Sequence, residues 1–353
     1  MVDRITTMPI TGGHSETEVL TGQKDDSSGL HFVTLARSPA GRLHNTTGRI
    51  TMTQKKSTGL SRRNLLVAGG GALAAATLVT SFPLLAMKTH SVEKKMKKAV
   101  NITQVRNATL LIEYAGTTFL VDPLFADQGA LPGIKDSACS QFRNPLVPLP
   151  FSKDRLLAAD AVIVTHTHED HWDDAAKNAI PRDKPLFAQN EADAETIRGE
   201  GFSNVQVLTA NTRFNNIALT ITGGQHGNDR TVSDIPLGEV CGVVFSHPEY
   251  PTVYIAGDTI WNEHVQTAIT RHNPDVIVMN VGNAVFMGYE PIIMGMEDAL
   301  AVHKAAPGAM LIASHMEAIN HCILSRQTLR NYSVRHGFDK NLLIPADGET
   351  VRL

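Results

Sequence analysis

The sequence has few cysteines and almost no net charge for its length. Only three of the 353 residues are cysteines (Cys139, Cys241 and Cys322), and none belongs to a Cys-x-x-Cys pair. Their number and scatter exclude a disulfide framework, so we expect ordinary buried thiols, with one chance disulfide as the alternative. The formal net charge of −3 gives no reason to expect nucleic acid as a partner.

The charge that is present lies unevenly along the chain. Residues 1–86 contain nine Lys/Arg and five Asp/Glu, which leaves 23 and 30 for residues 87–353, a balance of −7. Residues 1–86 are therefore basic and residues 87–353 are mildly acidic. The acidic balance of residues 87–353 argues against a groove that binds a polyanion. With 42% hydrophobic residues, the chain can bury a sizeable core in one large domain or two ordinary ones.

The first 86 residues contain two different segments. Residues 1–51 show no sustained helical or strand period, so we expect disorder there, or a translation start at Met52. Residues 52–86 have the layout of an export signal, with paired basic residues before an uncharged stretch from Leu65 to Ala86. Ser61-Arg62-Arg63-Asn64-Leu65-Leu66 resembles the twin-arginine motif that export machinery reads. We expect a periplasmic or otherwise exported protein, and the alternative is an uncleaved membrane anchor.

From about Val100 to the end, candidate strands and helices follow one another without a repeat or a linker. This part of the sequence predicts one α/β domain, 100–353. The predicted strands are 100–105, 109–114, 117–122, 161–165, 217–222, 253–256, 276–279 and 310–313, and the predicted helices are 173–180, 263–271 and 296–306. The loop 125–153 contains four prolines and lacks regular structure. Such a loop is a lid, a specificity segment or a surface wrap.

One short segment, residues 166–171, is rich in side chains that can bind a metal, and it directly follows an apolar predicted strand. In His166-Thr167-His168-Glu169-Asp170-His171, the first two histidines are two residues apart in extended chain and point to the same side. Asp170 and His171 come where a helix begins. Four ligand-type side chains in six residues are hard to bury without a cation, and imidazole with carboxylate suits zinc, iron or manganese. The alternative is a polar turn with surface histidines.

Three more candidate ligands follow other predicted strands. His226, Asp258 and His315 come just after the strands 217–222, 253–256 and 310–313. Ligands at strand ends converge along one rim of a sheet, where sites in α/β folds tend to lie. His226 follows Gly223-Gly224, which would permit a tight turn. Asp258 has an alternative role as a helix cap, and His321 is a rival of His315, or else orients a ligand or contacts substrate.

These blocks, in this order, resemble the metallo-β-lactamase superfamily, and most of all its branch with the ascorbate-6-phosphate lactonases and the N-acyl-phosphatidylethanolamine phospholipases D. Asp122-Pro123 and the closing 344–349 segment also resemble that branch. The resemblance covers roughly residues 100–353 and implies a four-layer αβ/βα sandwich with metals at one edge. Many members have Gly-His where this chain has Arg106-Asn107.

The resemblance implies a ligand set for two divalent metal ions, Zn²⁺ first and Mn²⁺ as the alternative. His166, His168 and His226 would hold the first ion, Asp170, His171 and His315 the second, and Asp258 would bridge them. A water shared by two cations becomes a hydroxide nucleophile near neutral pH, and Asp170 could orient it. His303 matches a substrate-facing histidine of the phospholipases D, so it is a catalytic candidate beside Asp170, although a helix-surface position is equally open.

The sequence thus predicts a metal-dependent hydrolase that cleaves an ester, lactone or phosphodiester bond of a small or lipid-like substrate. A metal-binding or sensing protein without catalysis is the first alternative, and a β-lactamase is the weaker one. Cys241 is expected inside a strand and is not assigned as a ligand. The remaining histidines, His247, His264, His272 and His336, have no context that favours a role in the site.

Overall fold

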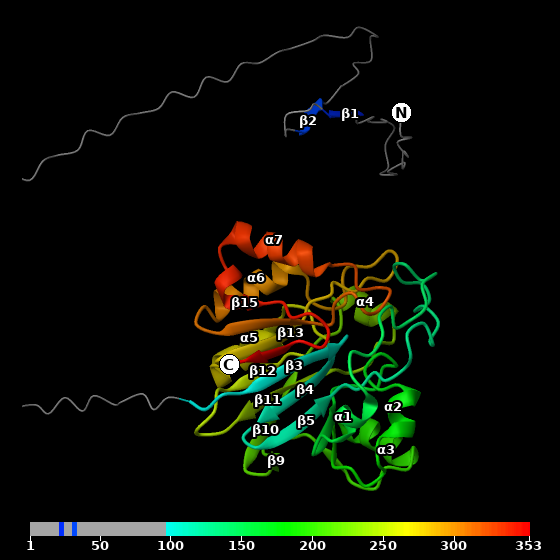
Figure 1. Ribbon diagram of the computed structural model, residues 1–353, viewed down its shortest axis with the longest axis vertical. Coiled ribbons are helices and arrows are strands. Elements are labelled where there is room, and N and C mark those ends of the chain that lie inside the picture. Colours follow the sequence, from blue (N-terminus) through cyan, green and yellow to red (C-terminus); the bar gives the residue numbers. More distant parts are fainter. Residues whose placement is uncertain (1–20, 25–29, 34–96) are drawn as a thin grey trace, which may run out of the picture. The chain divides into compact units, whose positions relative to one another are not determined.

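The computed structural model describes residues 21–24, 30–33 and 97–353 (Figure 1). The chain divides into two units, 1–86 and 87–353. In the first, β1 (Thr21–Lys24) and β2 (Leu30–Val33) pair antiparallel. The sequence predicted no strand there, because four residues are too few for an alternating pattern to show. The predicted export signal and the start at Met52 lie outside the described residues.

The second unit contains two sheets of seven strands each. The first sheet has the order β16 (Thr350–Arg352), β3 (Asn101–Arg106), β4 (Thr109–Tyr114), β5 (Thr117–Val121), β6 (Ala161–Val164), β7 (Leu186–Ala188), β8 (Val205–Val207). The second has the order β15 (Leu342–Leu343), β14 (Met310–Ser314), β13 (Val276–Asn280), β12 (Val253–Ile255), β11 (Cys241–Ser246), β10 (Ile217–Gly223), β9 (Arg213–Phe214).

The helices lie outside the sheets, with α6 (Met296–Ala305) and α7 (Arg326–His336) on one side of the strands and α2 (Asp174–Ala179) and α3 (Glu191–Gly199) on the other (Figure 1). The remaining helices are α1 (Lys153–Leu157), α4 (Asp229–Asp234), α5 (Glu263–His272) and the 3₁₀ turn Asp339–Asn341. None of the helices in the described part of the chain is long and apolar enough to cross a membrane.

Three buried clusters define the layers. Ile112 and Phe119 of the first sheet and Val243 and Ile255 of the second belong to one cluster between the sheets. Alternate residues of the same strands point away from the other sheet. Those of the second sheet form a cluster with α5, α6 and α7, and those of the first sheet form a cluster with α1, α2 and α3. The order helix, sheet, sheet, helix is the predicted four-layer αβ/βα sandwich.

The direction of the strands decides where the site lies. β5, β6, β7 and β8 run parallel, and so do β12, β13, β14 and β15. The carboxyl ends of each parallel set therefore lie along one edge of their sheet, and polar residues that follow these strands are brought together there.

Candidate metal centre

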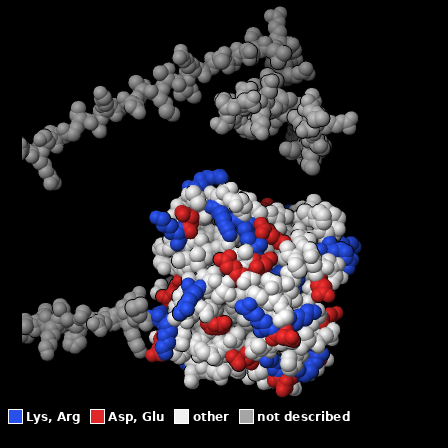
Figure 2. All heavy atoms as spheres, viewed as in Figure 1, with Lys and Arg blue, Asp and Glu red and all other residues white. Residues whose placement is uncertain are grey.

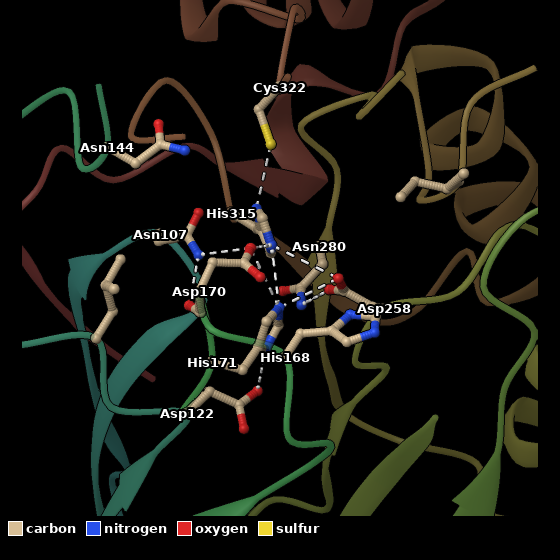
Figure 3. Close-up of polar contacts among 12 residues, drawn as sticks. Asn107, Asp122, Asn144, His168, Asp170, His171, Asp258, Asn280, His315 and Cys322 are labelled. Atoms are coloured by element: carbon tan, nitrogen blue, oxygen red, sulfur yellow. Dashed lines mark hydrogen bonds and ion pairs between the residues drawn. The ribbon is translucent and has the colours of Figure 1, made fainter. Parts of the chain in front are cut away.

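The predicted ligands follow strands of both sheets, and they lie close together in space. Figure 3 shows His168, Asp170, His171, Asp258 and His315 gathered in this way. Each of three groups places its ligand atoms within 4.8 Å of one another. The groups are His166, His168 and His226; His166, His171 and Asp258; and Asp170, His171 and His315. Two of them are the ligand sets that the sequence predicted for two ions, and the third shares a residue with each set.

Asp258 stands between the two sets. Its Oδ2 lies 3.1 Å from His171 Nε2, 3.6 Å from both His226 Nε2 and His315 Nε2, and 4.0 Å from His166 Nε2. Its Oδ1 accepts a hydrogen bond of 2.7 Å from Asn280 Nδ2. One oxygen is thereby fixed and the other faces both sets, which is the placement that a bridging carboxylate requires.

The donor set fits a cation better than a hydrogen-bond network. His171 Nε2 lies 3.2 Å from His315 Nε2, and His166 Nε2 lies 2.9 Å from His168 Nδ1. Two unprotonated imidazole nitrogens cannot hydrogen-bond to each other, whereas both can bind one metal ion. These residues fit divalent metal ions with nitrogen and oxygen ligands.

The histidines are oriented through their other ring nitrogen. His171 Nδ1 lies 2.9 Å from Asp122 Oδ2, and Asp122 is itself held by the amide and hydroxyl of Thr165 at 2.7 Å each. His226 Nδ1 lies 2.9 Å from the carbonyl of Ile292, and His315 Nδ1 lies 3.3 Å from Cys322 Sγ. Contacts of Nδ1 with a carboxylate or a carbonyl favour a proton on Nδ1 and leave Nε2 free to bind a metal.

Charge and burial act against each other in the cluster. Burial lowers the pKa of His166 well below its ordinary value, and the neighbouring histidines lower it further. Burial also acts to lower the pKa of His171, but Asp258 and Asp170 outweigh it and raise that pKa to about 10. Burial acts to raise the pKa of Asp170, yet His171 and the hydrogen bond from His315 hold it well below its usual value.

Asn107 occupies the place where many members have histidine, and it supports the ligands instead. Its Nδ2 donates to the carbonyl of Asp170 at 2.9 Å, and its carbonyl accepts from the amide of His315 at 2.9 Å. Asn107 and His315 both have a left-handed backbone, with φ of 53° and 57°. Sparsely populated backbone conformations often concentrate at functional sites.

A cavity of about 210 Å³ opens beside the ligands. Its polar lining consists of the ligands His168, Asp170, His226 and Asp258 together with Glu169, His321 and Asn144. The rest of its wall is apolar, with Leu131, Ile134, Leu237, Phe286, Ile292 and Ile319. Three lining residues belong to the loop 125–153, so this loop shapes the cavity and is not merely a surface wrap.

Some predictions from the sequence need correction. His303 on α6 stacks on Phe338, with ring centroids 5.4 Å apart, and it does not line the cavity. The structure therefore does not bring this catalytic candidate to the site, because α6 turns it toward α7. Cys139 is exposed rather than buried. Cys241 begins β11 rather than lying inside it, and its thiol contacts the carbonyl of Thr165 at 3.4 Å.

Neither Gly223 nor Gly224 has a left-handed φ. A Cβ on Gly223 would lie 2.5 Å from Nδ1 of the exposed His264 side chain, which would have to shift. His264 and His336 are exposed and His247 and His272 are partly exposed, and none belongs to the ligand groups of the described chain.

The sequence assigned no orienting role to the residues that hold the ligands, although it marked Asp122 as a family feature and Asn107 as a departure from the family; the four residues are Asp122, Asn280, Asn107 and Cys322. Asp122 follows β5 and Asn280 ends β13. The rule that found the ligands at strand ends would have found these two as well. Asn107 lies in a turn, and Cys322 forms an isolated bridge with Ala284.

Comparison with known proteins defines the class of this site. A model of the beta-lactamase superfamily domain matches residues 117–316. The crystal structure of an isothiocyanate hydrolase from Delia radicum gut bacteria is 47% identical with a TM-score of 0.70, covering 71% of this chain and 98% of that one. A possible metal-dependent hydrolase from Veillonella parvula is 41% identical, also with a TM-score of 0.70, covering 72% and 99%.

The chain therefore belongs to the metallo-β-lactamase superfamily, and it is a metal-dependent hydrolase. Within the superfamily it belongs to the UPF0173 family, because it is 46% identical over 252 residues to the UPF0173 protein YddR of Bacillus subtilis, covering 71% of this chain and 99% of that protein. More distant relatives include proteins named UPF0173 metal-dependent hydrolase and a yeast N-acyl-phosphatidylethanolamine-hydrolyzing phospholipase D.

Proposed function

We propose that the protein hydrolyses small, neutral, largely apolar isothiocyanates at a centre of two zinc ions. The observation that carries this proposal is the cavity. It combines an apolar wall with the metal ligands, and none of the described residues that line it is Lys or Arg. The similarity to an isothiocyanate hydrolase at 47% identity names a substrate with these properties.

The cavity disfavours the larger or charged substrates that the sequence left open. A phosphodiester carries a negative charge, and sites for phosphate usually supply Arg or Lys beside the metal. Here the additional charged group is Glu169, whose carboxylate would repel an anion. A volume of about 210 Å³ is also small beside the range of about 300–1,000 Å³ for drug-sized ligands. A small lactone or ester remains the second candidate, because it too is neutral.

The residues present fit two ions, held by His166, His168 and His226 and by Asp170, His171 and His315, with Asp258 between them. Such a pair would lower the pKa of water and polarise the substrate. The chain itself supplies the orientation of the ligands, through Asp122, Asn280, Asn107 and Cys322. Asp170 lines the cavity, where its carboxylate could accept a hydrogen bond from a water molecule and orient it toward the substrate.

The proposed reaction balances without a further reactant. The water oxygen bonds to the central carbon of R–N=C=S, and the nitrogen takes up a proton. The remaining hydroxyl proton then moves to the nitrogen as the bond between carbon and nitrogen breaks, which releases the amine R–NH₂ and carbonyl sulfide. The apolar wall would hold the organic group R, because an apolar lining favours the burial of a neutral substituent.

A substrate panel tests the proposal. The zinc-loaded protein is assayed with benzyl isothiocyanate, a small lactone, p-nitrophenyl acetate, bis-p-nitrophenyl phosphate and nitrocefin. We expect the isothiocyanate to give the highest kcat/KM, with equal amounts of amine released and isothiocyanate lost. Faster cleavage of the phosphodiester or of nitrocefin would contradict the proposal, and full metal occupancy without turnover of any substrate would favour a binding protein.

A further inference from the structure

Among the described residues that line the cavity, only His321 has a buried side-chain polar atom without a hydrogen-bond partner. It lines the cavity together with the metal ligands, yet it belongs to none of the three ligand groups. Only 4% of the residue is exposed, and its Nδ1 is buried without a hydrogen-bond partner. A buried polar nitrogen without a partner is rare and needs an explanation.

The backbone around His321 is fixed on both sides. The carbonyl of His321 accepts from the amide of Val285 at 3.0 Å. The preceding residue, Asn320, donates to Ser137 Oγ and the carbonyl of Ala138, and it accepts from Asn144 Nδ2, at 2.9, 2.7 and 2.7 Å. The next residue, Cys322, contacts His315. A group held so firmly on a rigid wall is suited to contact a bound molecule.

The missing partner indicates which nitrogen of His321 carries the proton. An unpaired acceptor is tolerated in protein interiors more often than an unpaired N–H group. Nδ1 is therefore the unprotonated nitrogen, and the proton resides on Nε2. Phe286 lies beside the ring, with centroids 6.1 Å apart, so apolar surface flanks it. The imidazole can then offer a single N–H donor to whatever occupies the cavity.

We propose that His321 is a catalytic residue whose Nε2–H donates a hydrogen bond to the substrate heteroatom on which charge develops during hydrolysis. This role rests on the proposed function, because it requires a substrate in the cavity. A fixed donor of this kind stabilises the transition state without reorganisation. His321 thus takes the substrate-facing role for which the sequence offered His303.

The variants His321→Gln and His321→Leu separate donation from packing. Glutamine places an N–H donor near the position of Nε2, and leucine fills space without one. With the substrate that the wild-type protein cleaves best, we expect His321→Leu to lose about 100-fold in kcat/KM, mostly in kcat. His321→Gln should retain activity within about tenfold of wild type, and both variants should keep the wild-type metal content. The control variant His303→Gln should retain wild-type kinetics.

A spectroscopic readout keeps the test independent of turnover. In ¹⁵N-histidine-labelled, zinc-loaded protein, the ring signals that disappear in His321→Gln should report a neutral ring with the proton on Nε2. Wild-type kcat/KM in His321→Leu, or a proton found on Nδ1, would overturn the role of His321. Silence of the wild-type protein with every substrate of the panel would instead contradict the proposed function, and the ring signals would still decide the state of His321.

Discussion

Asp122 is not one of the predicted ligands, but it contacts the ligand His171 and orients its ring. Its carboxylate accepts from Thr165 twice and contacts His171 Nδ1 at 2.9 Å. It is 1% exposed, so no water can replace these contacts. Hydrogen-bonded carboxylates of this kind fix the tautomer and raise the basicity of the ligand.

We therefore expect Asp122→Asn to weaken metal binding about 10- to 100-fold, because an amide cannot reproduce the charge that faces His171. The dissociation constant for zinc, measured in competition with a chelator, checks this. The matched control is Asp160→Asn, since Asp160 is exposed and its carboxylate accepts only from the amide of Thr118. Equal affinities for the two variants would contradict the role of Asp122.

Metal binding should release protons from the same cluster. The carboxylates around His171 outweigh its burial and raise its pKa to about 10, and the pKa of His315 is likewise raised well above its ordinary value. Because both imidazoles must be neutral to bind a metal, binding has to displace the protons that the neighbouring carboxylates retain. Zinc affinity should therefore rise with pH from 6 to 9, by up to about tenfold per unit for each proton.

Calorimetry in buffers of different ionisation enthalpy measures these protons. Binding should release at least one proton per chain at pH 7. Affinity that does not change with pH, with no proton release, would show that His171 and His315 are already neutral.

At the scale of the elements, the turn between β12 and Asp258 depends on one glycine. Gly257 has φ of +70°, and a Cβ there would lie 2.2 Å from the carbonyl oxygen of Cys241 in β11. The turn therefore holds the end of β12 close to β11, and this contact sets the position of the Asp258 carboxylate. Any larger residue must push Asp258 away from the other ligands.

Gly257→Ala should lower the free energy of unfolding by about 1–3 kcal/mol through backbone strain, and it should also lower the zinc occupancy. Gly238 provides the control, because its φ is +74° and nothing lies within 4 Å of an added Cβ. Gly238→Ala should show the backbone strain alone and keep full occupancy. Loss of zinc in both variants, or in neither, would contradict the importance of the contact with β11.

The sequence predicted the elements whose patterns were strong. Buried runs such as Ala161–Val164 and Val276–Asn280 became the central strands β6 and β13, and the ligands that follow such strands converged as expected. The helices α3 and α7 were not predicted, and burial does not explain the difference, because the predicted helix α6 also has only two buried residues. The cavity wall was also beyond prediction, since it is assembled from the loop 125–153 and from turns distant in sequence.

At the scale of the whole molecule, surface charge agrees with a small neutral substrate rather than a polymer. On the face that Figure 2 shows, basic and acidic side chains are interspersed, and neither sign forms a continuous field. Steering of a polyanion requires a surface of one sign. The charge on this face therefore does not favour a polyanionic substrate.

The N-terminal segment carries a separate proposal, namely that it directs export of the folded hydrolase. Arg62 and Arg63 precede the uncharged stretch in the sequence, and receptors read such pairs. The double variant Arg62→Lys, Arg63→Lys should leave most of the protein in the cytoplasm with normal activity, whereas wild type should reach the periplasm. Fractionation of the expressing cells checks this, and an unchanged distribution would contradict the proposal.

The most direct test of the whole account is turnover of benzyl isothiocyanate by metal-free protein as zinc is added in known equivalents. Two ligand sets joined by Asp258 predict that kcat/KM rises to a plateau at two equivalents per chain, and that His168→Ala never reaches it. A plateau at one equivalent would contradict the two-ion centre. Full activity without zinc, or none at any zinc level, would contradict the assignment of metal-dependent isothiocyanate hydrolysis.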